Sequence, residues 1–262
     1  MQQLSPGDAA MLERIDPARM LAHTQAWAAI SSGTGDLVGL AAMAEALAQA
    51  FSVLPGGGTL ESPAPVTAVD AAGQLVEQAN GHHLLLRVRP NAPRRLLLTG
   101  HMDTVYPPGH PFRELRWLDA GRLNGPGVAD MKGGIGVMLE ALCAFETCLD
   151  ASVVGYDVLV NADEETGSLA SAALITRLAY GKLAALTYEP SALPDGTLAH
   201  ARGGSGNYTL TFHGISAHAG RNPADGRNAI VAAADAALRL AAAALVTIAS
   251  TIREWAEAAM AL

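Results

Sequence analysis

The chain of 262 residues has few cysteines, few aromatic side chains and no surplus of positive charge. Its two cysteines, Cys143 and Cys148, cannot form a disulfide framework, and we interpret them as buried thiols on one predicted helix. Lys and Arg total 17 against 25 Asp and Glu, and no basic stripe is visible, which argues against nucleic acid as a partner. The longest apolar run near the C-terminus, residues 240–249, is far shorter than the ~20 residues that span a bilayer, so we expect no membrane insertion.

We also expect no export signal at the N-terminus, because residues 1–10 contain no basic region. The stretch that follows, up to residue 50, indicates amphipathic helix. Glycine clusters at 133–136 and 203–206 match neither phosphate-loop nor dinucleotide-loop spacing. Half of the residues are hydrophobic, which is enough for a sizeable core, and we expect a soluble cytoplasmic protein.

The most informative motif is a histidine and an aspartate two residues apart, His101 and Asp103, directly after the apolar run 96–98. If that run is a strand, its period of two places both side chains on one side at the strand's C-terminal end. Imidazole is a good zinc ligand, and a nearby carboxylate can accept a hydrogen bond from the second ring nitrogen. An ordinary hydrogen-bonded His–Asp pair is the alternative interpretation of this motif taken alone.

A second motif places Asp130 where a glycine-rich turn leads into a helical pattern that begins near Gly133. One interpretation is a helix N-cap, since Asp is among the best capping residues. The other is a carboxylate that a rigid turn holds toward a cavity. The two interpretations are compatible.

Carboxylates also follow two further strand candidates. Glu164 and Glu165 come after residues 156–160, and Glu189 comes after residues 184–188. The acidic run at 163–165, taken alone, is typical of a solvated loop. Sites in α/β sheets gather at the carboxyl ends of strands, however, and one histidine with several carboxylates is a ligand set for a hydrolytic divalent metal.

Together these motifs, in this order from about residue 96 to about residue 240, resemble the M20 family of metallopeptidases and deacylases. The sequences of residues 101–106 and 125–134 are most similar to the glutamate carboxypeptidase branch of this family. The family also includes acetylornithine deacetylase and succinyl-diaminopimelate desuccinylase. The resemblance implies an α/β fold in which residues 1–193 form a zinc-hydrolase catalytic domain with a mostly parallel sheet. Residues 194–262 would form an incomplete α+β lid or dimerisation domain.

The resemblance further implies two Zn²⁺ ions, with Co²⁺ as an alternative, and hydrolysis of an amide bond in a small peptide or N-acyl amino acid. Glu164 would be the general base, and Asp103 would orient the metal-binding histidine. The implied metal ligands are His101 and Glu189 for the first zinc, Glu165 for the second, and Asp130 as the bridge between the two.

The beginning of a lid is also recognisable. Residues 207–213 alternate like a half-buried strand, and a long alanine-rich helix is expected after residues 223–230. Between them, residues 214–220 resemble the family's lid motif, whose histidine, here His218, stabilises the oxyanion of the tetrahedral intermediate, commonly across a dimer. We therefore expect a homodimer formed through the lid. A polar loop histidine is the alternative interpretation of His218.

The sequence departs from the family in one respect, because no histidine follows His218. Family members have a late histidine that completes the second zinc site, so the chain looks truncated or internally deleted, with two carboxylates left for the second ion. We interpret His82 and His83, which precede a strand, as surface or edge residues. The alternative function is a catalytically impaired family member that acts at most as a metal-binding or dimerisation module.

Overall fold

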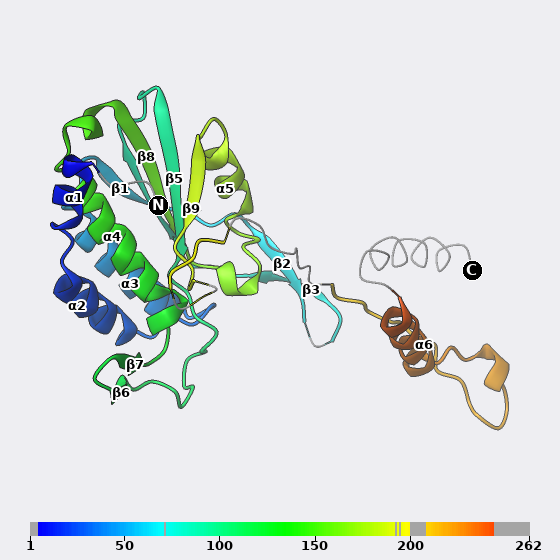
Figure 1. Ribbon diagram of the computed structural model, residues 1–262. Coiled ribbons are helices and arrows are strands. Elements are labelled where there is room, and N and C mark those ends of the chain that lie inside the picture. The colour runs from blue at the N-terminus through cyan, green and yellow to red at the C-terminus, as the bar shows by residue number, and fades with distance from the viewer. Residues whose placement is uncertain (1–4, 71, 192, 194, 200–207, 244–262) are drawn as a thin grey trace. The chain divides into compact units, whose positions relative to one another are not determined.

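A computed structural model describes residues 5–70, 72–191, 193, 195–199 and 208–243 (Figure 1). The chain divides into two compact units, Met1–Ser205 and Gly206–Leu262. The boundary after residue 193 that the sequence indicated stays a prediction.

Three helices form the N-terminal segment, α1 (Pro6–Leu12), α2 (Pro17–Ala28) and α3 (Leu37–Phe51), so the helical expectation for this stretch is confirmed. A proline begins α1 and α2, where its missing N–H costs nothing. Each helix follows a residue whose side-chain oxygen accepts a hydrogen bond from the first turn, namely Ser5, Asp16 and Asp36. The loop between α2 and α3 contacts residues 102–104 through Ser32 and Thr34.

A five-stranded sheet forms the centre of the first unit, in the order β1-β4-β8-β5-β9. Its strands are β1 (Gly57–Glu61), β4 (His83–Val88), β8 (Val154–Asn161), β5 (Arg94–His101) and β9 (Ala184–Thr187). The last three run parallel to one another. β4 pairs antiparallel with β8, and β1 pairs antiparallel with β4, so β1 runs in the same direction as the three parallel strands and β4 alone is reversed. All three strands that the sequence indicated, near 96–98, 156–160 and 184–188, are therefore present, and the α/β class is confirmed.

Helices cover both faces of this sheet (Figure 1). On one face α3 and α4 (Gly133–Phe145) enclose the main core, and on the other α5 (Ala172–Ala179) covers a smaller cluster. The main core includes Met43, Leu47, Ile135, Met138, Leu139, Val158 and Val160, and the smaller one Leu85, Leu97, Leu159, Leu174 and Leu178. Two hairpins, β2 (Val66–Val69) with β3 (Leu75–Gln78) and β6 (Arg116–Asp119) with β7 (Arg122–Asn124), lie outside the sheet.

The interpretation of His83 as a surface or edge residue is wrong. His83 is completely buried at the start of β4, and its Nδ1 accepts a hydrogen bond of 3.2 Å from the backbone N–H of Ala162. The reason is that β1 pairs with the outer side of β4, so β4 is an interior strand. His82 is exposed, as expected.

The cysteines differ slightly from expectation. Cys143 lies on α4, but Cys148 lies beyond the helix, which ends at Phe145. Both thiols are free and half-buried.

The second unit contains α6 (Ala229–Ala242), which confirms the alanine-rich helix over those residues. The strand expected at 207–213 is wrong for residues 208–213, which are exposed and have no ladder partner among the described residues; residue 207 lies outside them. An alternating pattern becomes a strand only when its backbone groups find a partner. Among residues 208–243 the β-type backbone pairing is a single bridge between Ile215 and Arg227. In the part of the chain that is described, no helix has the length and apolarity needed to cross a bilayer.

A buried ion cluster, formed by Asp157, Arg95 and Lys182, links β8 to β5 and to the loop before β9, and substitution of Asp157 gives a first prediction. Asp157 on β8 is 1% exposed and lies 2.6 Å from Arg95 Nη2 and 2.8 Å from Lys182 Nζ. Asp157→Ala leaves two cations without their carboxylate, so we expect the free energy of unfolding in urea to fall by about 3 kcal/mol. The control is Asp119→Ala in the exposed pair with Arg122, which should leave the urea midpoint unchanged. Equal midpoints for the two variants would contradict the prediction.

Candidate metal centre

The three parallel strands bring their carboxyl ends to one edge of the sheet. His101 is the last residue of β5, Glu164 and Glu165 follow the end of β8, and Glu189 follows the end of β9. The strand order therefore collects, at one place, side chains that are almost 90 residues apart in the sequence.

Asp130 reaches this place from the turn Val128–Lys132, which precedes α4. The next residue, Met131, is completely buried, and its sulfur accepts a hydrogen bond of 3.2 Å from the N–H of His101, so the turn is packed against β5. The peptide bond between Asp130 and Met131 is cis. The N-cap interpretation of Asp130 is wrong, because the cap position of α4 is Lys132, which makes no side-chain capping bond.

Gly134 allows the first turn of α4 to approach the residue that follows β9. A Cβ atom on Gly134 would lie 1.9 Å from the carbonyl oxygen of Tyr188, so only glycine fits there. This close contact brings the first turn of α4 next to the residue before Glu189, and so brings Asp130 and Glu189 to the same site.

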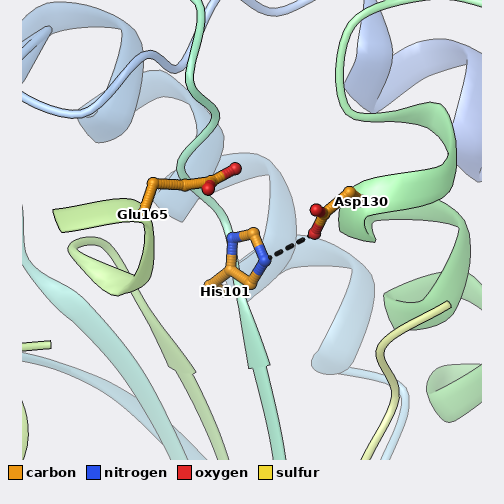
Figure 2. Close-up of side chains that lie close together, drawn as sticks. All are labelled: His101, Asp130 and Glu165. Carbon is orange, nitrogen blue, oxygen red and sulfur yellow. Dashed lines mark hydrogen bonds and ion pairs between the residues drawn. The ribbon is translucent and has the colours of Figure 1, made fainter. Parts of the chain in front are cut away.

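The ring of His101 is the centre of the cluster (Figure 2). Its Nε2 lies 2.9 Å from an oxygen of Asp130, 3.6 Å from one of Glu189 and 4.0 Å from one of Glu164. Two groups of three side chains have ligand atoms within 4.8 Å of one another: His101 with Asp130 and Glu165, and His101 with Glu164 and Glu189. The structure thus brings together all four residues that the sequence named as ligands, and Glu164 with them.

The charges in this cluster perturb its titrating groups. Burial lowers the pKa of His101, but the hydrogen bond and charge of Asp103 and the charges of Glu189 and Asp130 outweigh burial and raise that pKa to about 9. Burial raises the pKa of Glu165 to about 7, with further increases from Asp130, Asp103 and Glu164. Burial is also the main cause of the raised pKa of Glu189. The cluster therefore carries an excess of negative charge that a divalent cation would offset.

Asp103 lies behind the histidine and is completely buried. One carboxylate oxygen lies 3.4 Å from Nδ1 of His101 and accepts a hydrogen bond of 3.2 Å from the N–H of Glu164. The other accepts bonds from the hydroxyl of Thr34, at 2.7 Å, and the N–H of Glu165, at 3.2 Å. Nδ1 of His101 also lies 3.0 Å from the carbonyl oxygen of Asp103. These contacts occupy Nδ1 and leave Nε2 facing the carboxylates.

Sequence reasoning missed two buried residues around the cluster. Asp163, the first of the three consecutive acids, is 1% exposed and accepts hydrogen bonds from the N–H groups of Ala170 and Ser171. It therefore holds the loop that carries Glu164 and does not belong to the solvated run that the sequence suggested. Lys132 is also 1% exposed, and burial lowers its pKa to about 8. A lysine beside two glycines gives no sequence signal for burial.

His218 lies in the second unit and is exposed. Its Nδ1 accepts a hydrogen bond from the N–H of Gly220, and its own N–H donates to the side chain of Asn222. The oxyanion role of His218 stays a prediction.

The fold and the site define an α/β protein with a candidate metal centre at the carboxyl ends of its parallel strands. Residues 97–261 match peptidase family M20/M25/M40, and the chain belongs to this family. It is 35% identical over 216 residues to carboxypeptidase G2 of Pseudomonas sp. (strain RS-16), which covers 80% of this chain and 48% of that protein. It is 31% identical over 167 residues to acetylornithine deacetylase of Proteus mirabilis (strain HI4320), covering 60% of this chain and 40% of the relative.

A solved structure, that of human carnosine dipeptidase 1, resembles this fold with a TM-score of 0.53 and 19% sequence identity. The likeness covers 68% of this chain and 40% of that one. The chain thus spans less than half the length of these relatives.

The contacts of Asp103 give a second prediction. Asp103→Asn keeps the size of the side chain but removes the charge beside His101, so we expect the affinity for Zn²⁺ to fall about 10–100-fold. Competition with a chromogenic chelator measures it. Asp70→Asn is the control, because Asp70 accepts similar backbone hydrogen bonds from Ala72 and Gln74 in an exposed turn. An unchanged affinity in Asp103→Asn would show that Asp103 does not support the centre.

Proposed function

We propose that the chain is a metal-dependent hydrolase of amide or peptide bonds, of the carboxypeptidase or N-acyl-amino-acid deacylase type. The observation that carries this proposal is the buried ring of His101 with Nε2 turned toward Asp130, Glu189 and Glu164. The names of two relatives, a carboxypeptidase and an acetylornithine deacetylase, support the two substrate classes. The substrate would be a small peptide or an N-acyl amino acid.

The residues present fit a divalent metal of the zinc type. Zinc takes nitrogen and carboxylate ligands, and a metal-binding histidine usually directs its second nitrogen to a carboxylate or carbonyl, as His101 does toward Asp103. The proposed assignment is His101, Asp130 and Glu189 for one Zn²⁺, with Asp130 and Glu165 facing a second; Co²⁺ would fit the same ligands. A bound ion of this kind supplies Lewis acidity toward the scissile carbonyl and makes a water nucleophilic near neutral pH.

The two neighbouring glutamates have different proposed roles. Glu164 would take the proton of the attacking water and pass it to the leaving nitrogen. Its side chain is 47% exposed, so solvent and substrate can reach it, and its backbone is fixed by Asp103. Glu165 would bind metal. Both side chains belong to candidate ligand groups, so substitution must separate the two roles.

The second unit would serve as a lid. We propose that His218 contacts the oxyanion of the tetrahedral intermediate and that two chains associate through this unit; sedimentation of the full chain at micromolar concentration tests the association. A monomer would remove the dimer from the proposal.

The role of Glu164 gives a third prediction. Glu164→Gln keeps the shape of the side chain but cannot take a proton, so we expect hydrolysis to fall roughly 10²–10⁴-fold. The metal content of the purified variant should equal that of the parent chain. Glu165→Gln is the matched control: because Glu165 is assigned to the weakly held second ion, titration with Zn²⁺ beyond one ion per chain should show weaker binding than in the parent chain. Loss of metal from Glu164→Gln would show that the two roles are reversed.

Metal stoichiometry gives a fourth prediction. In the proposed assignment only Asp130 and Glu165 would hold the second ion, which is fewer protein ligands than catalytic zinc usually has, so we expect one tightly bound metal and a second bound weakly or not at all. Elemental analysis after dialysis should find about one ion per chain, and His101→Ala should remove it. Two tightly held ions would reveal a further ligand. A chain that holds metal without any turnover would instead favour the impaired, metal-binding alternative.

A further inference from the structure

Three consecutive residues of the turn before α4 point to three different parts of the first unit. Asp130 faces His101, Met131 packs under β5, and the side chain of Lys132 reaches the C-terminal end of α2. There Nζ donates hydrogen bonds to the carbonyl oxygens of Trp27, at 3.1 Å, and Ile30, at 2.9 Å. Carbonyl groups at the end of a helix lack intrahelical partners, so a lysine there is well placed to bind them.

The loop that follows these carbonyls holds the end of β5. Ser32 donates its hydroxyl to the carbonyl oxygen of Met102, at 2.7 Å, and its own carbonyl accepts from the N–H of Thr104, at 2.9 Å. The N–H of Thr34 donates to the carbonyl of Thr104, and the Thr34 hydroxyl donates to the carboxylate of Asp103. Residues 30–34 therefore fix the segment that orients His101.

The turn before α4 leaves room for the aliphatic stem of Lys132. Gly127 has a φ of 70°, and a Cβ atom there would lie 3.0 Å from both Cδ and Cε of Lys132 and 3.0 Å from Thr104 Cγ2. The absence of a side chain at Gly127 thus leaves the space that the lysine stem uses. With 1% of its surface exposed, Lys132 is held between the turn, α2 and the end of β5.

We propose that Lys132 is a positioning residue of the metal centre. It joins the turn that carries Asp130 to the loop that holds Asp103, and so fixes the two halves of the centre relative to each other. This inference rests on the proposed function, since it concerns the same metal site. A methionine would fill the same space without the cost of burying an ammonium group, so the hydrogen bonds of Lys132 are expected to order the site more than to stabilise the fold.

The experiment measures Co²⁺ binding to the full chain by chelator competition and by visible absorption. Lys132→Met should weaken Co²⁺ affinity about 10–100-fold, the usual loss when a group that orients metal ligands is removed, and should shift the Co²⁺ absorption bands. The thermal midpoint of the metal-free chain should change less than in Met138→Ala. Met138 is completely buried on α4, so its truncation should destabilise the fold but leave Co²⁺ affinity unchanged.

A double variant tests the route through the loop. Thr34→Val removes the hydroxyl bond to Asp103 and should weaken Co²⁺ binding by itself. If Lys132 acts through Thr34, both substitutions break the same route to Asp103. The double variant, Lys132→Met with Thr34→Val, should then bind Co²⁺ with about the affinity of whichever single variant binds it less tightly. Fully additive losses would overturn the inference.

Three further outcomes would overturn the inference, the last of them together with the proposed function. Unchanged Co²⁺ affinity and absorption in Lys132→Met overturn the inference and leave the proposed function intact. Lys132→Gln keeps an N–H donor and should lose less affinity than Lys132→Met; if neither variant folds, Lys132 is structural and the inference is wrong. A parent chain that binds no Co²⁺ overturns the proposed function and the inference together.

Discussion

The carboxylate of Asp103 is buried at the end of β5, where an unpaired charge would be prohibitively costly. It is tolerated because donors surround it: the Thr34 hydroxyl, the N–H groups of Glu164 and Glu165, and Nδ1 of His101. These donors come from segments that are far apart in the sequence. The loop before α3, the end of β5 and the loop after β8 must therefore meet for the fold to bury this charge, and that meeting also assembles the candidate site.

The sheet determines which side chains can take part. Since β8, β5 and β9 are parallel neighbours, the residues after each strand end lie at one edge. Parallel neighbours need crossover connections, and α4 supplies the one between β5 and β8. Asp130 lies within this crossover, in the turn just before α4. The same connection that makes the strands parallel thus delivers a carboxylate that no strand end could provide.

The sequence predicted the strand ends and the residues after them, because apolar runs and the change to polar residues are local signals. It failed where the outcome depends on distant neighbours. His83 is buried because β1 covers its strand, and Lys132 is buried because α2 ends beside it. Residues 208–213 alternate like a strand but lack a described partner. Local patterns indicate what a segment can form, whereas burial and pairing depend on what lies next to it.

The charge of the cluster connects the fold to the proposed chemistry. Without a metal, a proton on His101 supplies positive charge among the carboxylates. The carboxylates stabilise this protonated ring, which is why the pKa of His101 is raised to about 9. Because that pKa lies above the value of about 6.5 for a free histidine, the protonated ring contributes stability below about pH 6.5. That contribution is lost as the pH rises through about 9. A metal ion needs the same nitrogen in its neutral form, so binding must displace the proton. Proton and metal are therefore alternative partners for one set of carboxylates, and the carboxylates that crowd His101 in the fold are the ones that would hold the ion.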